Sequence, residues 1–113
     1  MSRHDDQVSL KDMLSHAREA ADLLGDARRE ELERNRVLQL ALTRLVEIVG
    51  EAANRVSLLT RQKNPKIPWD QIIGMRNRLV HGYDVLDLDL LWNTVTNDLP
   101  PLIAAIGMIV EGK

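Results

Sequence analysis

The sequence predicts an all-α fold, a bundle of four to five helices that run mostly antiparallel. Apolar residues recur at steps of three and four over long stretches, and no stretch shows the alternation of a strand. The segments between these stretches are short, which favours antiparallel neighbours. Because 113 residues are the size of one domain, we expect a single helical domain over residues 1–113.

Composition narrows the class of protein. Apolar residues make up 44% and charged residues 28%, which is typical of a soluble globular protein. No apolar run approaches the roughly 18 residues that span a bilayer, and the first residues lack the apolar core of a signal peptide, so we expect no membrane partner. The absence of cysteine favours a reducing cytoplasm. With a net charge of −2, any nucleic-acid binding needs a local basic patch.

Two helices are expected in the first half of the chain. Residues 1–7 are polar and expected to be frayed, and the first helix then extends to Gly25, a residue that can end a helix. The second helix is expected from about Arg29 to Leu59, because one apolar stripe continues through it. That stripe consists of Leu38, Ala41, Leu42, Leu45, Val49, Ala52, Val56 and Leu59. Residues 60–68 are polar and contain two prolines, so they are expected to form a loop.

The second half of the chain predicts two or three further helices. Pro68 suits the first turn of a helix that runs from Trp69 to about Val80 or His81, where Gly82 can turn the chain away. Asp87 is expected to cap the next helix. The Pro100–Pro101 pair either kinks that helix or separates it from a last one, and we favour the kink.

The polar groups with catalytic reach lie together between Arg76 and Tyr83. His81 is the only histidine outside the amino-terminal region, and Tyr83 is the only tyrosine. A histidine that can transfer a proton near neutral pH, beside fixed positive charge, is the minimum apparatus for cleaving a phosphodiester without a metal. The alternative is that these residues cap a helix end and form ion pairs, and spacing alone favours that alternative.

Helical geometry places conditions on this motif. Arg76 falls between two apolar groups of the third helix, so its guanidinium needs a partner such as Glu47 or Glu51. Asn77 and His81 form an i,i+4 pair, in which Asn77 can orient the imidazole. Arg76 and His81 are about 140° apart on an ideal helix. They converge on one phosphate only if Arg76 reaches around, if His81 lies where the helix ends, or if two protomers share the pocket.

Several other polar residues have a simpler structural interpretation. Glu51 and Arg55 are four residues apart on a helix and would pair at its surface. His4 and His16 have no second metal-binding group at a suitable spacing, so we expect no metal site there. The aspartates of residues 84–89 are explained by capping of the following helix rather than by a cation.

The segment from Ile67 to Tyr83 resembles the signature of the HepT-like branch of the HEPN superfamily. Arg76, Asn77 and His81 fit the core pattern of an arginine, a polar residue, three further residues and a histidine. Tyr83 fits the tyrosine that follows two residues after the histidine. Three further segments are similar as well, so the resemblance covers nearly the whole chain: Gly50–Asn54, Leu91–Asn93 and Leu99–Pro100.

The resemblance implies a HEPN-type helical bundle and a metal-independent endoribonuclease without a cofactor. His81 would be the general base or acid on the ribose 2′-OH and the leaving 5′-oxygen, and Arg76 would stabilise charge on the phosphorane. Asn77 would position His81 or the phosphate, and Arg78 would widen the phosphate-binding surface. Glu51, in the similar Gly50–Asn54 segment, would be a supporting residue.

The resemblance also implies partners. The protein would be the toxin of a two-gene, type VII-like toxin–antitoxin system, a homodimer whose two motifs line one cleft that cleaves RNA. Its antitoxin would resemble a minimal nucleotidyltransferase that attaches AMP to Tyr83. The alternative is a HEPN-fold partner subunit that binds such a nucleotidyltransferase and cleaves nothing. The intact set of Arg76, Asn77 and His81 favours the enzyme.

Overall fold

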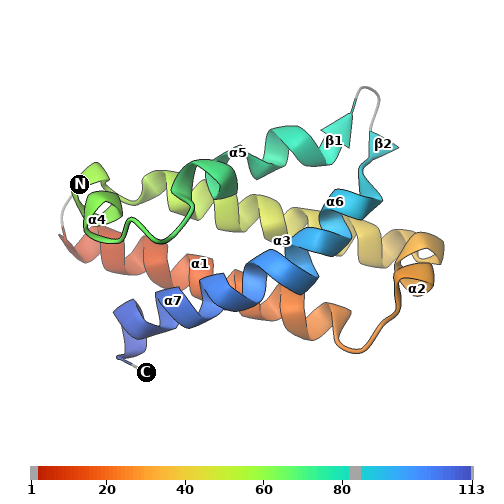
Figure 1. The fold of residues 1–113 in the computed structure, drawn as a ribbon, viewed down its shortest axis with the longest axis horizontal. Helices are drawn as coiled ribbons and strands as arrows, with labels where there is room; N and C mark the ends of the chain where they lie inside the picture. Colours follow the sequence, from red (N-terminus) through yellow and green to blue (C-terminus); the bar gives the residue numbers. More distant parts are fainter. Residues whose placement is uncertain (1–2, 82–84, 113) are drawn as a thin grey trace.

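The computed structural model describes residues 3–81 and 85–112, and for Arg3, His4, Arg76, Val80 and His81 it describes the backbone alone. The chain forms the following elements in order (Figure 1): α1 (Arg3–Leu24), α2 (Arg29–Arg34), α3 (Arg36–Arg55), α4 (Leu58–Lys63), α5 (Trp69–Leu79), β1 (Val80–His81), β2 (Val85–Leu86), α6 (Leu88–Asn93), the π-helical turn η1 (Thr94–Asp98) and α7 (Leu99–Glu111).

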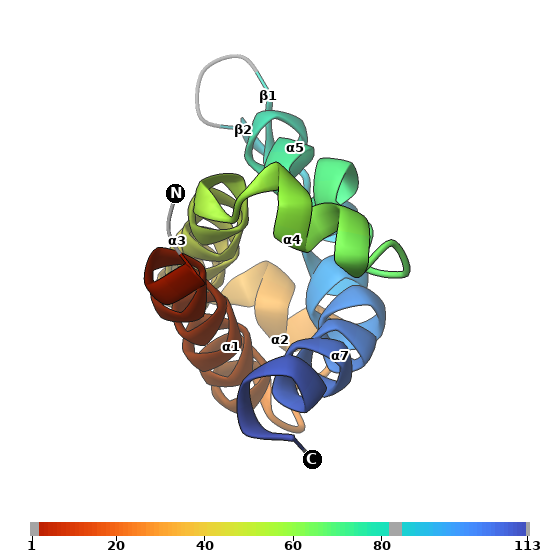
Figure 2. The same ribbon diagram turned by 90° about the vertical axis from the view of Figure 1, so that its left-hand side faces the viewer.

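The long helices alternate in direction, which confirms the predicted all-α, mostly antiparallel bundle. Helix α1 packs against α3 and α7, and α5 packs against α3. Figure 2 shows α1, α3, α5 and α7 around one centre, with α4 at the end that faces the viewer. Strands β1 and β2 lie at the carboxyl end of α5, away from α4 (Figure 1).

The core consists of the apolar stripes that the sequence predicts. Each fully buried aliphatic side chain contributes roughly 1.5–3 kcal/mol relative to an exposed one, so these side chains supply most of the favourable free energy of folding. The largest of them are Leu10, Met13, Leu32, Leu42, Leu79, Leu91 and Ile106.

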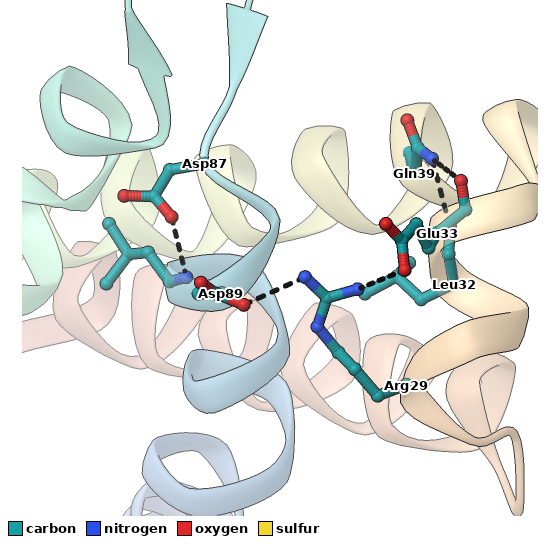
Figure 3. Close-up of polar contacts among 7 residues, drawn as sticks. Arg29, Leu32, Glu33, Gln39, Asp87 and Asp89 are labelled. Atoms are coloured by element: carbon teal, nitrogen blue, oxygen red, sulfur yellow. Dashed lines mark hydrogen bonds and ion pairs between the residues drawn. The ribbon is translucent and has the colours of Figure 1, made fainter.

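The single helix expected from Arg29 to Leu59 is wrong, because the backbone breaks twice within it. At the first break, the Asn35 side chain accepts a hydrogen bond from the Leu38 N–H at 3.0 Å and caps α3. The Gln39 side-chain amide donates to the carbonyls of Leu32 and Glu33 at 2.9 and 3.1 Å (Figure 3), so the carbonyls at the end of α2 are also satisfied. The apolar stripe continues across this break because α2 and α3 face the same core.

At the second break, Ser57 caps α4 by accepting a hydrogen bond from the Thr60 N–H at 3.3 Å. Residues 60–63, expected in a loop, are therefore helical. Asp6 lies within the segment expected to be frayed, yet it is buried, and its carboxylate accepts bonds from the Ser57 N–H, the Ser57 hydroxyl and the Thr60 hydroxyl at 2.9, 2.6 and 2.6 Å. The hydrogen bonds from Ser57 and Thr60 hold the pKa of Asp6 below its usual value.

Residues 88–111 form one continuous helical run, so the two prolines do not separate two helices. Pro100 and Pro101 stand in the first turn of α7, where missing N–H groups are tolerated best. The irregularity lies just before them, in the π-turn η1. There the Thr94 and Thr96 hydroxyls donate to the Leu90 and Trp92 carbonyls, both at 2.7 Å, which satisfies acceptors in a region of irregular backbone pairing.

Candidate functional site

Helix α5 carries the predicted motif, and its start is anchored firmly. Trp69 is buried, and its indole Nε1 donates to the Asn64 carbonyl at 3.0 Å. Asp70 stands in the first turn, where a negative charge suits the helix dipole. Met75 and Leu79 bury one face of the helix in the core. This packing fixes the rotation of α5 about its axis and leaves Asn77 and Arg78 exposed.

Gly50 sets the distance between α5 and α3. A Cβ atom at Gly50 would lie 2.9 Å from the backbone oxygen of Ile72, closer than real Cβ atoms come to another atom. The two helices can therefore approach this closely only because residue 50 has no side chain. The close crossing brings the exposed face of α3 beside Ile73 and Asn77.

The two helices enclose a pocket of about 210 Å³ at this crossing. Its lining residues are Glu47, Gly50, Glu51, Asn54, Ile73 and Asn77. The structure thus brings together two of the predicted supporting residues, Glu51 and Asn77. It also adds Glu47, considered in the sequence only as an ion-pair partner, and two residues that sequence reasoning missed, Asn54 and Ile73. The pocket has two carboxylates in its wall, so it suits a cation or a hydrogen-bond donor better than a phosphate.

One ion pair on α3 differs from the expected one. Glu51 accepts a hydrogen bond from the Arg44 guanidinium at 3.2 Å, and Arg55 lies 3.9 Å from the carboxylate of Asp12. The predicted Glu51–Arg55 pair is therefore wrong. The long Arg44 side chain reaches two turns along its own helix here, so spacing of i,i+4 does not by itself decide the partner.

His81 lies in a strand and not in the helix. Helix α5 ends at Leu79, and His81 then pairs with Val85 across a two-residue antiparallel ladder. The Asp87 N–H donates to the Leu79 carbonyl at 2.8 Å and closes the base of this hairpin. Helix α5 ends one residue before the expected Val80, so His81 does not stand one helical turn after Asn77, and the orientation of its imidazole by Asn77 stays a prediction. The histidine lies where the helix ends, one of the three conditions that the geometry allowed.

Polar contacts hold the segment that follows the hairpin (Figure 3). The Asp87 carboxylate accepts from the Leu90 N–H at 3.0 Å, so the predicted cap of α6 is confirmed. Asp89 instead pairs with Arg29 of α2 at 2.8 Å, and the same guanidinium lies 4.0 Å from Glu33. The start of α6, which follows β2, is thereby held against α2, and this contact fixes the position of β2 relative to the bundle. Asp84 lies outside the described residues.

The structure does not test every part of the motif. Tyr83 lies outside the described residues, and Arg76 and His81 are placed by their backbone alone, so their convergence stays a prediction. Arg78 is exposed, and its Nη2 donates to the Gln71 carbonyl at 2.6 Å, so its guanidinium turns back along α5.

Among residues 5–75, 77–79 and 85–112, no group of three His, Cys, Asp or Glu side chains is placed to hold a metal ion. The Nδ1 of His16 donates a hydrogen bond of 2.7 Å to the Asp12 carbonyl. None of the helices in the described part of the chain is long and apolar enough to cross a membrane.

Fold and site together define a small helical-bundle protein in which a short hairpin carries a histidine directly after an arginine-bearing helix. The chain belongs to the ribonuclease HepT-like family, whose model matches residues 13–109. It is therefore a ribonuclease of the HepT type.

Relatives of similar length support this membership. A Methanocaldococcus jannaschii protein, named provisionally as an RNase, is 34% identical over 102 residues, which cover 90% of this chain and 94% of the relative. A Thermococcus cleftensis protein named "Probable ribonuclease HepT" is 35% identical over 98 residues, which cover 83% of this chain and 89% of the relative. No solved structure matches this chain.

Proposed function

We propose that this ribonuclease cleaves RNA internally without a metal ion, with His81 and Arg76 as its catalytic residues. One observation supports the proposal above the others: the helix that carries Arg76 ends two residues before His81. The histidine is therefore not held at the 140° separation of an ideal helix, which would have kept the two side chains apart. Instead, His81 lies at the base of the hairpin. That base is fixed by strand pairing and by the hydrogen bond from the Asp87 N–H to the Leu79 carbonyl.

The proposed reaction is a transesterification within the RNA strand. The ribose 2′-oxygen attacks the adjacent phosphorus, and the bond from phosphorus to the 5′-oxygen of the next nucleotide breaks. His81 takes the proton from the 2′-OH or supplies the proton to the leaving 5′-oxygen, and Arg76 stabilises the negative charge of the phosphorane. The products are a cyclic 2′,3′-phosphate and a 5′-hydroxyl.

The neighbouring residues suggest how the substrate lies. Asn77 is exposed and lines the pocket that contains Glu47 and Glu51, called the acidic pocket from here on, and it positions the phosphate or His81. Glu47 and Glu51 in that pocket repel phosphate, so the RNA backbone avoids the pocket, and the exposed Arg78 offers it a phosphate contact besides Arg76. Glu51 is a positioning residue, because its carboxylate is already engaged by Arg44.

The proposal extends to the biological setting that the family resemblance implies. The protein acts in the cytoplasm as the toxin of a two-gene toxin–antitoxin module. It forms a homodimer in which two copies of the motif share one cleft. A minimal nucleotidyltransferase antitoxin neutralises it by transferring AMP from ATP to Tyr83, because the added negative charge and bulk beside Arg76 and Arg78 exclude RNA phosphate.

The catalytic proposal is tested with purified protein and RNA in the presence of EDTA. We expect cleavage that leaves a cyclic phosphate or its hydrolysis product, and we expect His81→Ala to abolish it. His16→Ala is the matched control, since His16 is the histidine bonded to its own helix on α1, and it should retain full activity. A requirement for magnesium, or activity that survives His81→Ala, would show that the assignment is wrong.

The modification proposal is tested by co-expression with the nucleotidyltransferase and intact-mass analysis. Tyr83 is the only tyrosine in the chain, so mass additions in units of AMP should disappear in Tyr83→Phe. A neutralised toxin of unmodified mass would contradict the proposal and favour inhibition by complex formation.

A further inference from the structure

A second pocket lies on the other flank of α5. Ile73 and Asn77 face the acidic pocket, whereas Gln71 and Met75 line this one, about half a helical turn away around the axis. Its volume is about 180 Å³. Helices α3, α5 and α7, the π-turn η1 and the loop before α5 all contribute to its wall, whose apolar members include Val46, Ile72, Met75, Leu99, Leu102 and Ala105.

We propose that this pocket binds one nucleobase of the RNA substrate, a subsite that rests on the proposed ribonuclease function. The size of the pocket fits such a ligand, because an apolar cavity of about 150 Å³ is known to hold one benzene ring. Single-stranded RNA offers unstacked bases for capture of this kind, with their flat faces on apolar side chains and their edges on polar groups.

The polar residues of the pocket can form hydrogen bonds with the edge of a bound base. Lys66, Gln71 and Asp98 line it, and none of these three side chains forms a hydrogen bond or ion pair with another described residue. A carboxylate accepts hydrogen bonds from ring N–H and amino groups, as Asp and Glu do from cytosine N4. Guanine offers two adjacent donors of this kind, N1–H and the N2 amino group, whereas uracil, cytosine and adenine each offer one, so the pocket prefers guanine.

The position of Arg78 connects the pocket to the motif. The Arg78 guanidinium is bonded to the Gln71 carbonyl at 2.6 Å, and Gln71 lines the pocket. Arg78 thus lies between the motif at the end of α5 and the residues that line the pocket, and its exposed positive charge can bind RNA phosphate there. Because the acidic pocket on the other flank repels phosphate, an RNA backbone bound to Arg78 places a base near this mouth, beside the cleaved bond and not at it.

The test measures binding without cleavage. Nucleoside 5′-monophosphates and ribose 5-phosphate are titrated into the protein while the methyl resonances of Ile72, Met75 and Leu102 are followed by NMR. We expect these resonances to shift most strongly with GMP, less with AMP, CMP and UMP, and not with ribose 5-phosphate. Equal binding of UMP and GMP, or benzene binding as tightly as GMP, would overturn the proposal.

Two adjacent alanines of α7 provide a matched pair of variants. Ala105 lines the pocket, so Ala105→Leu fills it and should weaken GMP binding by roughly 5- to 150-fold, the range for the loss of one base-stacking contact. Ala104 is exposed, and Ala104→Leu should bind GMP as the wild type does. If Ala105→Leu fails to fold, Asp98→Asn provides the second test, since it should erase the preference for GMP over UMP. Unchanged binding or unchanged preference would refute the subsite.

Different measurements test the proposed catalytic residues and the proposed base subsite. His81→Ala should lose cleavage and keep nucleotide binding, because His81 follows the carboxyl end of α5, whereas the residues of α5 that line the pocket lie between Gln71 and Met75. Sequencing of the RNA ends should show that Ala105→Leu still cleaves but with a flatter base preference near the cut. Retained cleavage in His81→Ala counts against the proposed catalytic residues, whereas an unchanged end profile in Ala105→Leu counts against the base subsite.

Discussion

The approach of α3 to α5 allows a prediction with a built-in control. In Gly50→Ala the new methyl group would lie 2.9 Å from the Ile72 carbonyl oxygen, about 0.5 Å inside the lower limit of ordinary contact. That oxygen belongs to the backbone of α5 and cannot turn aside, so the helix itself must move. Gly74→Ala, on α5, is the matched variant, because its methyl group would meet nothing within 4 Å.

The two substitutions have opposite expected effects on stability. Replacing a helical glycine by alanine contributes about 1 kcal/mol in both cases, since alanine restricts the unfolded chain and favours the helix. At Gly50 the overpacking costs about 1–3 kcal/mol, so the net change is a loss of roughly 0–2 kcal/mol. A change of 1 kcal/mol moves the melting temperature of a domain of this size by about 4 °C.

Thermal unfolding at a fixed protein concentration measures both variants. We expect Gly74→Ala to melt higher and Gly50→Ala to melt lower than the wild type. Ribonuclease activity should fall further in Gly50→Ala than its stability alone explains, because α5 carries the motif and moves with the clash. If both variants melt higher by the same amount, the close crossing at Gly50 is not a real constraint and the reasoning is refuted.

Two further predictions concern the ends of helices. Asp6→Ala should cost about 1.5–3 kcal/mol near neutral pH. Because folding lowers the pKa of Asp6 from 3.8, its contribution is complete above that value and is lost as the pH falls through the lower folded pKa. Urea unfolding at pH 7 and at about pH 2 should therefore show the difference shrink, and a difference independent of pH would contradict the carboxylate's role. Asp87→Ala should cost about 1 kcal/mol as a lost cap. Asp89→Ala, whose side chain is 92% exposed, should cost less than about 0.5 kcal/mol, and equal losses would mean that the Arg29 pair matters more than its exposure suggests.

Much of the fold was predictable because helix periodicity and helix termini are local signals. Gly25 ends α1 with a φ of +51°, and Asp87 caps α6, both as expected from residue type. The breaks at Asn35 and Ser57 were missed although both residues are good caps. A continuous apolar stripe reports which side chains face the core, and that information survives a break as long as the next helix keeps the same face inward.

The site was predictable only in part. The motif residues stand close together in the sequence, so they could be recognised there. The acidic pocket depends on the crossing of α3 and α5, a contact between residues more than twenty positions apart such as Gly50 and Ile72, which no local pattern encodes. The strand that carries His81 has two residues, too few for the alternation by which strands are recognised.

The π-turn between α6 and α7 has a consequence for how the chain tolerates changes of length. A π-turn accommodates one extra residue within a helix while the flanking α-helical segments keep their own faces toward the core. Deleting one residue within Thr94–Asp98 would convert the turn to ordinary α-helix and leave Leu91 and Leu102 in register. A one-residue deletion inside α6 or α7 would instead rotate everything beyond it by about 100° and expose the core face. Natural variation in helix length among homologues should therefore concentrate at this turn.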